Sequence, residues 1–177
     1  GNIGIMLETL IESGIPQILV APALPAVRRI TVHGVHYVDG LPLSNHEISR
    51  DPFFPVISSR VENVIRRHTH LQISHLDLEQ IRSMDAIELS DYFGKLAPVI
   101  VADSETQEDL KHLAEALRLK EDTLACGSAG LISALYSPCD NYFNPISLVQ
   151  PVVILRGSPA HLGRQQLDED RKSTRLN

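Results

Sequence analysis

Two short apolar runs constrain the fold of this chain more than any other feature. Residues 18–21 form one run between Pro16 and Pro22, and residues 98–103 form a second that ends in Asp103. Uninterrupted apolar runs of this length between turn signals are typical of strands buried on both faces of a parallel sheet. A helical pattern over about 106–118 follows the second run. This order predicts an α/β fold with an open, mostly parallel sheet flanked by helices.

Weaker patterns predict the other elements. Apolar residues at helical spacing predict a helix over 3–11, with Asn2 as its N-cap and Gly14 as its C-terminal stop. We expect further helices near 60–69 and 78–83 and a strand near 71–75. Apolar residues at 124–126 and 152–155 precede two Gly-Ser pairs, and both segments predict a strand, a turn and a helix.

Residues 29–43 do not follow the alternation of strands and helices predicted for the rest of the chain. The segments 29–33 and 35–38 alternate in polarity around Gly34, and Asp39-Gly40 is a tight-turn signal before residues 41–43. The pattern predicts a small antiparallel excursion from the main sheet. The Pro-rich residues 21–25 and residues 44–59, which have no clear period, are expected to be loops.

The sequence also suggests where domains begin and end. Residues 137–150 contain two prolines and several polar residues, which favours a linker. We therefore predict a first domain over 1–147 and the start of a second over 148–169, with 170–177 as a non-native polar tail. The chain begins with Gly-Asn-Ile-Gly and enters a helical pattern at once, so we expect a strand and a loop upstream of it.

Composition narrows the function. The chain has 177 residues, with 16 basic and 22 acidic side chains and a net charge of −6. A nucleic-acid partner is not expected, since such proteins carry a basic face, whereas a small anionic ligand needs only a few local donors. There is no charged-then-apolar leader and no apolar run of roughly 18 residues. We expect no membrane partner and a cytoplasmic location.

Several kinds of chemistry lack their motifs. Cys126 and Cys139 lie thirteen residues apart without a Cys-x-x-Cys pattern, so we interpret both as reduced thiols. The eight histidines do not fall at ligand spacing, and no metal ligand is predicted. A Gly-x-Ser-x-Gly nucleophile turn and a Walker loop are both missing from the sequence.

Ligands of open parallel sheets bind beyond the carboxyl ends of the strands. Four loops are predicted there: those after Ala21 and Asp103 and the turns at Gly127-Ser128 and Gly157-Ser158. A Gly-Ser turn that opens a helix offers backbone N–H groups and a hydroxyl to a carboxylate or phosphate. The alternative is that glycine merely permits the turn and serine caps the helix.

Two charged residues are candidates for ligand contact. Arg29 follows the Pro-rich loop, and its guanidinium could hold a carboxylate through two parallel hydrogen bonds. Asp103 could accept a hydrogen bond from a ligand hydroxyl or orient a neighbouring side chain. A surface arginine and a helix-capping acid are the alternatives for these two positions.

Several segments, in their order and spacing, resemble one known family, the four-carbon acid sugar kinases, formerly a domain of unknown function. The resemblance covers about residues 1–168, although Arg28 stands where the family has a glycine. The matching segments are Gly1-Asn2-Ile3-Gly4, the loop 21–25 followed by Arg29 and Thr31, Gly34-Val35-His36, Asp39-Gly40 with Pro42-Leu43, Asp51-Pro52 with Pro55-Val56, Asp103-x-Glu105-Thr106 with Asp109-Leu110, and Gly127-Ser128-Ala129-Gly130-Leu131.

The resemblance implies ATP-dependent phosphorylation of a hydroxyl on a four-carbon sugar acid such as threonate, erythronate or an oxo-tetronate, with Mg²⁺ carried by ATP. It also implies two domains, one for the acid and one for the nucleotide. By the same resemblance, the acid would contact Gly1, Asn2, Pro25, Arg29, Thr31 and Asp103, and ATP would contact Gly127, Ser128, Gly157 and Ser158.

This chain also departs from the family. Ala160 and Gly163 stand where serine and threonine are usual, and the family's acidic substrate loop and Gly-rich ATP loops have no counterpart. We therefore expect an incomplete two-domain kinase that is inactive as an isolated fragment. The alternatives are a non-catalytic module that binds a small acid or a partner, and a different α/β transferase.

Overall fold

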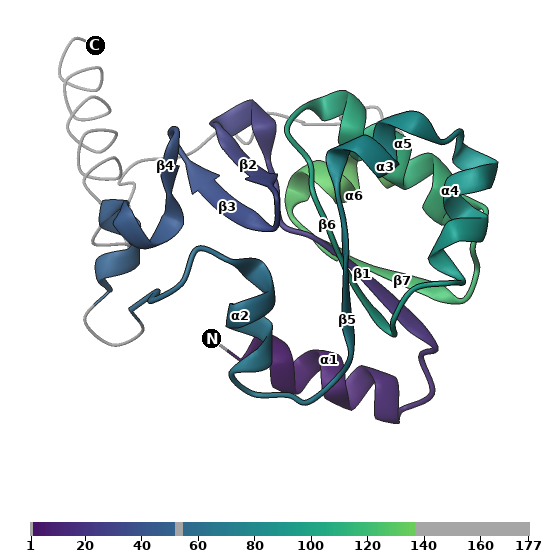
Figure 1. The fold of residues 1–177 in the computed structure, drawn as a ribbon, viewed down its shortest axis with the longest axis horizontal. Coiled ribbons are helices and arrows are strands. Elements are labelled where there is room, and N and C mark those ends of the chain that lie inside the picture. The colour runs from purple at the N-terminus through teal and green to yellow at the C-terminus, as the bar shows by residue number, and fades with distance from the viewer. Residues whose placement is uncertain (1, 52–54, 137–177) are drawn as a thin grey trace, which may run out of the picture. The chain divides into compact units, whose positions relative to one another are not determined.

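A four-stranded parallel sheet forms the centre of the fold, in a computed structural model that describes residues 2–51 and 55–136 (Figure 1). Its strand order is β5-β6-β1-β7, and all neighbours pair in parallel. The strands are β1 (Gln17–Ala21), β5 (Ile73–Leu76), β6 (Val99–Ala102) and β7 (Thr123–Gly127). Every residue of β1 and β6 is buried, as the continuous apolar runs predict.

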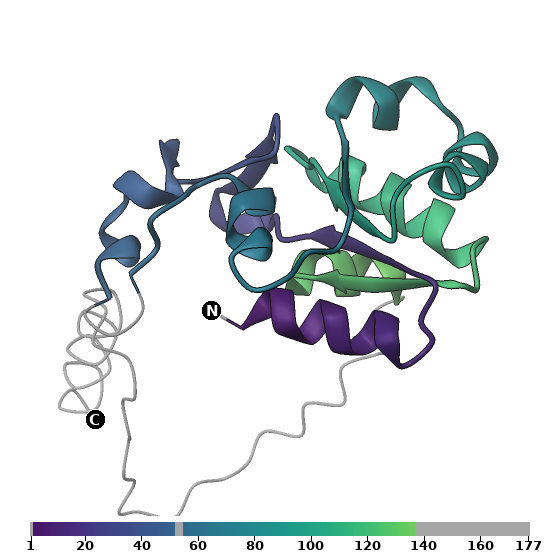
Figure 2. The ribbon, with the colours of Figure 1, turned by 60° about the horizontal axis from the view of Figure 1, so that its bottom comes forward.

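Helices cover both faces of this sheet (Figures 1 and 2). One face, with Leu19 and Ile100, packs with Phe93 and Leu110 in the larger core cluster. Its helices are α3 (Leu78–Ser83), α4 (Ala86–Phe93), α5 (Gln107–Arg118) and α6 (Ala129–Leu135). The opposite face packs against α1 (Ile3–Glu12) and α2 (Val61–Arg66), through a second cluster that includes Leu7 and Ile65. The two clusters alternate along each central strand, because successive side chains point to opposite faces.

A three-stranded antiparallel sheet follows β1 in the chain. It contains β2 (Arg29–Val32), β3 (Val35–Val38) and β4 (Leu41–Pro42), in that order. Each connection is a two-residue turn, His33-Gly34 and Asp39-Gly40, and all four residues have positive φ. Positive φ at both central positions is the type I′ geometry, which matches the twist of paired strands. The predicted antiparallel excursion is confirmed.

The first helix begins and ends as predicted, but its N-cap side chain makes no capping hydrogen bond. The Ile15 N–H donates to the Leu10 carbonyl and the Gly14 N–H to the Ile11 carbonyl, and Gly14 has a φ of 99°. This pair of bonds is a Schellman motif, which glycine permits at no steric cost. Asn2 occupies the N-cap position, but its side chain makes no capping hydrogen bond.

The predicted fold class agrees with the structure, and two local expectations need correction. The predicted loops contain three short 3₁₀-helices, at Pro25–Val27, Leu43–Asn45 and Glu47–Arg50. The helix α4 was not predicted at all. The predicted linker 137–150, the strand 152–155, the Gly157-Ser158 turn and the domain boundaries near 147 and 169 lie outside the described residues.

Candidate functional site

The small antiparallel sheet is attached to the carboxyl edge of the parallel sheet. Thr31 of β2 and Ser104, which follows β6, exchange two backbone hydrogen bonds of 2.9 Å each. Both residues are fully buried. The carboxyl ends of β1, β5, β6 and β7 and the β2–β3 turn therefore meet in one region, where open α/β sheets bind their ligands.

Asp103 fastens the β2–β3 turn to this edge. Its Oδ2 accepts from the His33 N–H at 2.7 Å, and its Oδ1 accepts from the Gly34 N–H at 2.8 Å. The residue has no exposed surface. Of the two roles that the sequence left open, the geometry corresponds to orienting neighbours, since in this conformation the carboxylate is covered.

Two cationic or ionisable side chains border the same turn. His75, in β5, places its Nε2 3.1 Å from Oδ2 of Asp103. Arg60, just before α2, donates from one terminal guanidinium nitrogen to the His33 carbonyl at 3.2 Å. Neither His75 nor Arg60 was among the predicted site residues. Neither has a sequence signal, because only the pairing of β5 with β6 and the return of the chain before α2 bring them here.

Arg29 and Thr31 are the first and third residues of β2, which precedes the β2–β3 turn. The Thr31 hydroxyl and Nδ1 of His36 are 3.0 Å apart, and both residues are buried. Burial lowers the pKa of His36, and the positive charge of Arg29 lowers it further. Arg29 itself is exposed, and its side chain makes no hydrogen bond or ion pair within the described part of the chain. Its guanidinium is thus available to an anionic ligand.

Arg28 differs from its neighbour. Its Nε lies 3.3 Å from Oδ1 of Asp39, and both side chains are more than half exposed. Its backbone is left-handed, with a φ of 57°. The two adjacent arginines therefore have separate environments, one paired at the surface and one unpaired beside His36.

The Gly127-Ser128 turn is engaged with the protein itself. The Ser128 hydroxyl donates to the Ala23 carbonyl and accepts from the Gly130 N–H at 3.0 Å. A Cβ on Gly127 would collide with the Ala21 carbonyl. In this conformation the turn packs the loop after β1 against α6, and its hydroxyl is not free for a phosphate. A nucleotide contact at Gly127 and Ser128 stays a prediction.

The remaining predicted contacts are dispersed. Asn2 is exposed at the start of α1, and Pro25 begins a 3₁₀-helix. Within residues 2–51 and 55–136, no hydrogen bond or ion pair joins either of them to Arg29, Thr31 or Asp103. Gly1, Gly157 and Ser158 lie outside the described residues.

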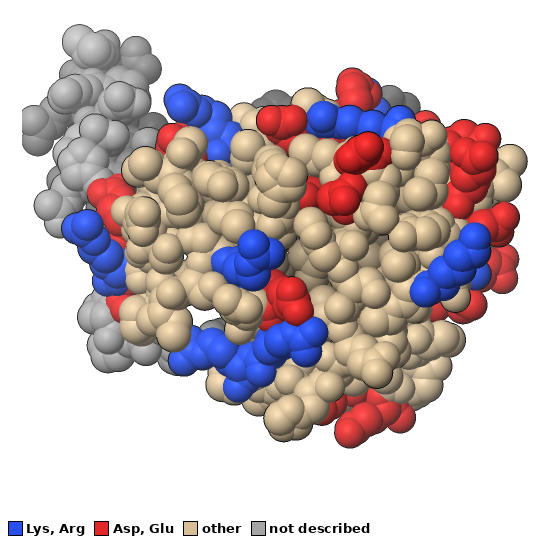
Figure 3. Space-filling view, in the orientation of Figure 1, with Lys and Arg blue, Asp and Glu red and all other residues tan. Residues whose placement is uncertain are grey.

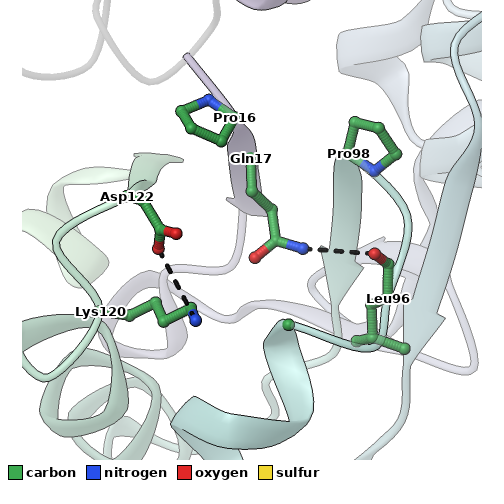
Figure 4. A pocket seen from close by; sticks show the side chains of 7 residues that line it. Pro16, Gln17, Leu96, Pro98, Lys120 and Asp122 are labelled. Carbon is green, nitrogen blue, oxygen red and sulfur yellow. Dashed lines mark hydrogen bonds and ion pairs between the residues drawn. The ribbon is translucent and has the colours of Figure 1, made fainter.

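A cavity of about 230 Å³ lies at the opposite, amino edge of the sheet (Figure 4). Gln17 is its most buried polar group, and the protein uses both ends of its amide. The side-chain nitrogen donates to the Phe93 carbonyl at 2.8 Å, and the side-chain oxygen accepts from Thr123 at 3.0 Å. The remaining cation, Lys120, lies 3.8 Å from Asp122. The lining is thus satisfied internally and offers a ligand little.

Charged side chains are distributed unevenly over the face of the molecule that Figure 3 shows. In Figure 3 a hollow lies on the side of the molecule that carries α2 and the antiparallel sheet, and Lys and Arg side chains stand near it with an acidic side chain between them. Acidic side chains gather instead over the α3–α5 side of the same view.

Metal sites and membrane-spanning helices are absent from the described residues. No group of three or more His, Cys, Asp or Glu side chains there could hold a metal ion. No helix in that part of the chain is long and apolar enough to cross a bilayer. Cys126 is a free thiol whose pKa is raised by burial, and Cys139 lies outside the described residues.

Comparison with known proteins places the chain in a family. A model of a sugar-binding N-terminal domain matches residues 1–135. A D-threonate kinase of Salmonella typhimurium is 28% identical over 172 residues, which cover 95% of this chain and 40% of that protein. A D-threonate kinase of Cupriavidus necator is 32% identical over 126 residues, covering 68% and 30%. A D-erythronate kinase of Heliobacterium modesticaldum is 28% identical over 126 residues, covering 67% and 28%.

Solved structures of other proteins have a fold similar to that of this chain. A Haemophilus influenzae protein superposes with a TM-score of 0.67 at 21% identity, over 76% of this chain and 33% of its own, which supports the fold. A domain of unknown function from Bordetella bronchiseptica, crystallised with citrate, superposes with a TM-score of 0.58 at 26% identity, over 69% and 29%. The chain spans 40% or less of the length of these relatives. It belongs to the four-carbon acid sugar kinase family and carries the sugar-binding N-terminal domain of that family.

Proposed function

We propose that this chain is the acid-binding part of an ATP-dependent kinase that phosphorylates a hydroxyl of a four-carbon sugar acid, such as threonate, erythronate or an oxo-tetronate. One observation carries the proposal. The unpaired guanidinium of Arg29 and the turn held by Asp103 lie at the carboxyl edge of the sheet, in a domain of a sugar-binding family.

The acid would be recognised through its carboxylate. Arg29 is exposed and has no partner within residues 2–51 and 55–136, so two parallel N–H donors can reach a carboxylate. The relatives named D-threonate and D-erythronate kinase support a four-carbon acid. The citrate in the Bordetella relative, itself a carboxylate ligand, is consistent with this recognition.

The second substrate would be ATP. Phosphoryl transfer needs alignment and charge neutralisation more than covalent chemistry, and Mg²⁺ bound to ATP would neutralise the phosphates. We propose the nucleotide contacts at Gly127, Ser128, Gly157 and Ser158 as the resemblance implies. At Ser128 the contact would fall to backbone groups, because the hydroxyl is already bonded to Ala23 and Gly130. Closure of the two domains would exclude water.

The test is an assay of the complete reading frame that contains this chain. The protein is incubated with ATP, Mg²⁺ and each of a panel of four-carbon sugar acids, and ADP and the phosphorylated acid are quantified. Turnover of one or more acids is expected. Saturable binding of an acid without turnover would instead favour the non-catalytic acid-binding module.

Arg29→Gln sharpens this assay, with Arg28→Gln as its matched control. We expect Arg29→Gln to raise KM for the acid about tenfold or more, since a charged hydrogen-bonded pair contributes about 1.5–3 kcal/mol. Arg28→Gln removes a neighbouring surface pair with Asp39 and should leave KM within about twofold. Equal KM values for the two variants would rule out Arg29 as the anchor.

A further inference from the structure

We propose that His75 and Asp103 form a dyad that accepts the proton of the substrate hydroxyl, a role that rests on the proposed kinase function. The two side chains come from adjacent strands. His75 pairs with Val101 in the register of β5 and β6, and Asp103 follows two residues later on the same face. This register places the imidazole beside the carboxylate.

The carboxylate is fixed, and the imidazole is accessible. Asp103 is fully buried, and both of its oxygens accept backbone N–H groups from the β2–β3 turn. Nε2 of His75 lies 3.1 Å from this carboxylate, within hydrogen-bond reach, while the His75 side chain remains 33% exposed. Nδ1 of His75 makes no hydrogen bond to any residue that the structure describes. We assign the imidazole proton to Nε2, on the side of the carboxylate, and this tautomer leaves Nδ1 as the proton acceptor.

Arg60 places a cation next to this acceptor. An ideal Cβ built on Gly34 would lie 3.0 Å from a terminal guanidinium nitrogen of Arg60 and 3.7 Å from Nε2 of His75. The guanidinium nitrogen is therefore within about 7 Å of Nε2 of His75. Arg60 thus places a positive charge close to the imidazole, while the carboxylate of the acid is assigned to Arg29.

Gly34 is the residue that keeps this space open. Its φ of 72° suits glycine, and any side chain there would press on the Arg60 guanidinium. The sharp turn thus brings backbone, rather than a side chain, beneath the two polar groups. The charged or titratable groups around the imidazole are Asp103 after β6, Arg60 before α2 and His33 in the turn.

The proposed step transfers the γ-phosphoryl group of ATP to the acid and moves one proton to the protein. The hydroxyl oxygen of the acid forms a bond to the γ-phosphorus of ATP, and the bond from that phosphorus to the β,γ-bridging oxygen breaks, so ADP leaves. The hydroxyl proton moves to Nδ1 of His75, and Asp103 orients the imidazolium that results. His75, which is partly exposed, then releases the proton to solvent. His75 is a catalytic residue in this step, and Asp103 is a positioning residue.

The same contacts also fit a purely structural clamp, so the test must separate the two roles. In the active full-length kinase, His75→Gln removes the basic nitrogen but keeps a polar side chain of similar length. His70→Gln is the matched control, because His70 is an exposed histidine in the loop before β5. For each variant we would measure kcat, KM for the acid, the pH dependence of kcat and the melting temperature.

We expect His75→Gln to lower kcat about 100-fold or more, as removal of a general base does. KM should stay within about threefold, the melting temperature should be nearly unchanged, and the fall of kcat toward low pH should disappear. His70→Gln should behave like the unsubstituted protein. A His75→Gln kcat within about threefold of normal, or an effect on KM or melting alone, would overturn the dyad.

Asp103→Asn provides a second test of the dyad. It keeps one acceptor oxygen for the turn but cannot stabilise an imidazolium by charge, so kcat should fall about tenfold or more in any folded variant. If Asp103→Asn fails to fold, His75→Gln still decides. If the unsubstituted protein turns over no four-carbon acid, the kinase proposal fails and the dyad fails with it. Turnover by the unsubstituted protein with normal His75→Gln kinetics overturns the dyad alone.

Discussion

The two sheets of this domain are held by different forces. The parallel sheet is stabilised by apolar burial, since every residue of β1 and β6 except Gln17 belongs to one of the two core clusters. The antiparallel sheet is held at its turn by polar contacts to Asp103, Ser104 and Arg60. We therefore expect the attachment of the hairpin to be less stable than the apolar scaffold, and two of the groups that hold it, Asp103 and Arg60, border the candidate site.

The largest expected effect tests the apolar half of this comparison. Leu19→Ala removes a fully buried side chain from the middle of β1. We expect the free energy of unfolding to fall by about 2–5 kcal/mol, because transfer and cavity costs add. Urea denaturation measures it, with Ile87→Ala as the control, since Ile87 is 66% exposed. A loss below about 1 kcal/mol for Leu19→Ala would contradict the account of the core.

The second prediction tests the polar contacts that hold the antiparallel sheet. Asp103→Asn places an amide among buried backbone N–H donors, and a hydrogen bond to a charged group is worth about 1.5–3 kcal/mol. Global stability should fall by about 2 kcal/mol, and amide hydrogen exchange at His33 and Gly34 should accelerate first. Asp122→Asn, at an exposed pair with Lys120, is the control. Exchange that accelerates equally in both sheets would show that the hairpin is not held locally.

A third, smaller effect concerns the link between α3 and α5. Burial alone would raise the pKa of Asp109, but hydrogen bonds from Arg82 and from the backbone of Glu105 and Thr106 lower it to about 2. A carboxyl with a lowered pKa stabilises the fold above its unfolded pKa, near 4, and this stability is lost as pH falls toward 2.

Arg82→Gln should therefore cost roughly 1 kcal/mol at pH 7, with the difference shrinking between pH 4 and pH 2. Denaturant titrations across this range measure the effect. Arg66→Gln, which breaks only the surface pair with Glu62, serves as the control. A loss from Arg82→Gln that does not vary with pH would show that side-chain packing, rather than charge, links these helices.

The smallest effect sharpens the assignment of Arg29. Because burial and then the Arg29 charge lower the pKa of His36, Arg29→Gln should raise that pKa part of the way toward its ordinary value. An NMR titration of the His36 imidazole detects the change. Arg28→Gln should leave it unaltered, since that guanidinium is paired with Asp39. No change in either variant would place the Arg29 guanidinium away from His36.

Local sequence was sufficient for much of the fold. A strand buried on both faces requires continuous apolar residues, so the runs at 18–21 and 99–102 were informative. Glycine after His33 and Asp39 supplied positive φ, so the two turns were predictable. The helix α4 was missed because it follows α3 almost directly. The capping box at Asp85 and Glu88 was a local signal for its start.

The candidate site was only partly predictable, because it depends on strand register. Asp103, Arg29 and Thr31 follow strands or turns that the sequence reveals, and the structure places them at the carboxyl edge. His75 becomes notable only when β5 pairs with β6, and Arg60 only when the chain returns to the turn before α2. Such contacts join residues far apart in sequence, and no local pattern contains them.

One measurement tests the central claim that ligands bind at the carboxyl edge of this domain. Amide hydrogen exchange of the full-length protein would be compared with and without the four-carbon acid that it phosphorylates. The account predicts slower exchange at residues 29–36 and 103–104, with little change around Gln17 and Thr123. Protection confined to the amino-edge cavity, or no protection anywhere in the domain, would contradict it.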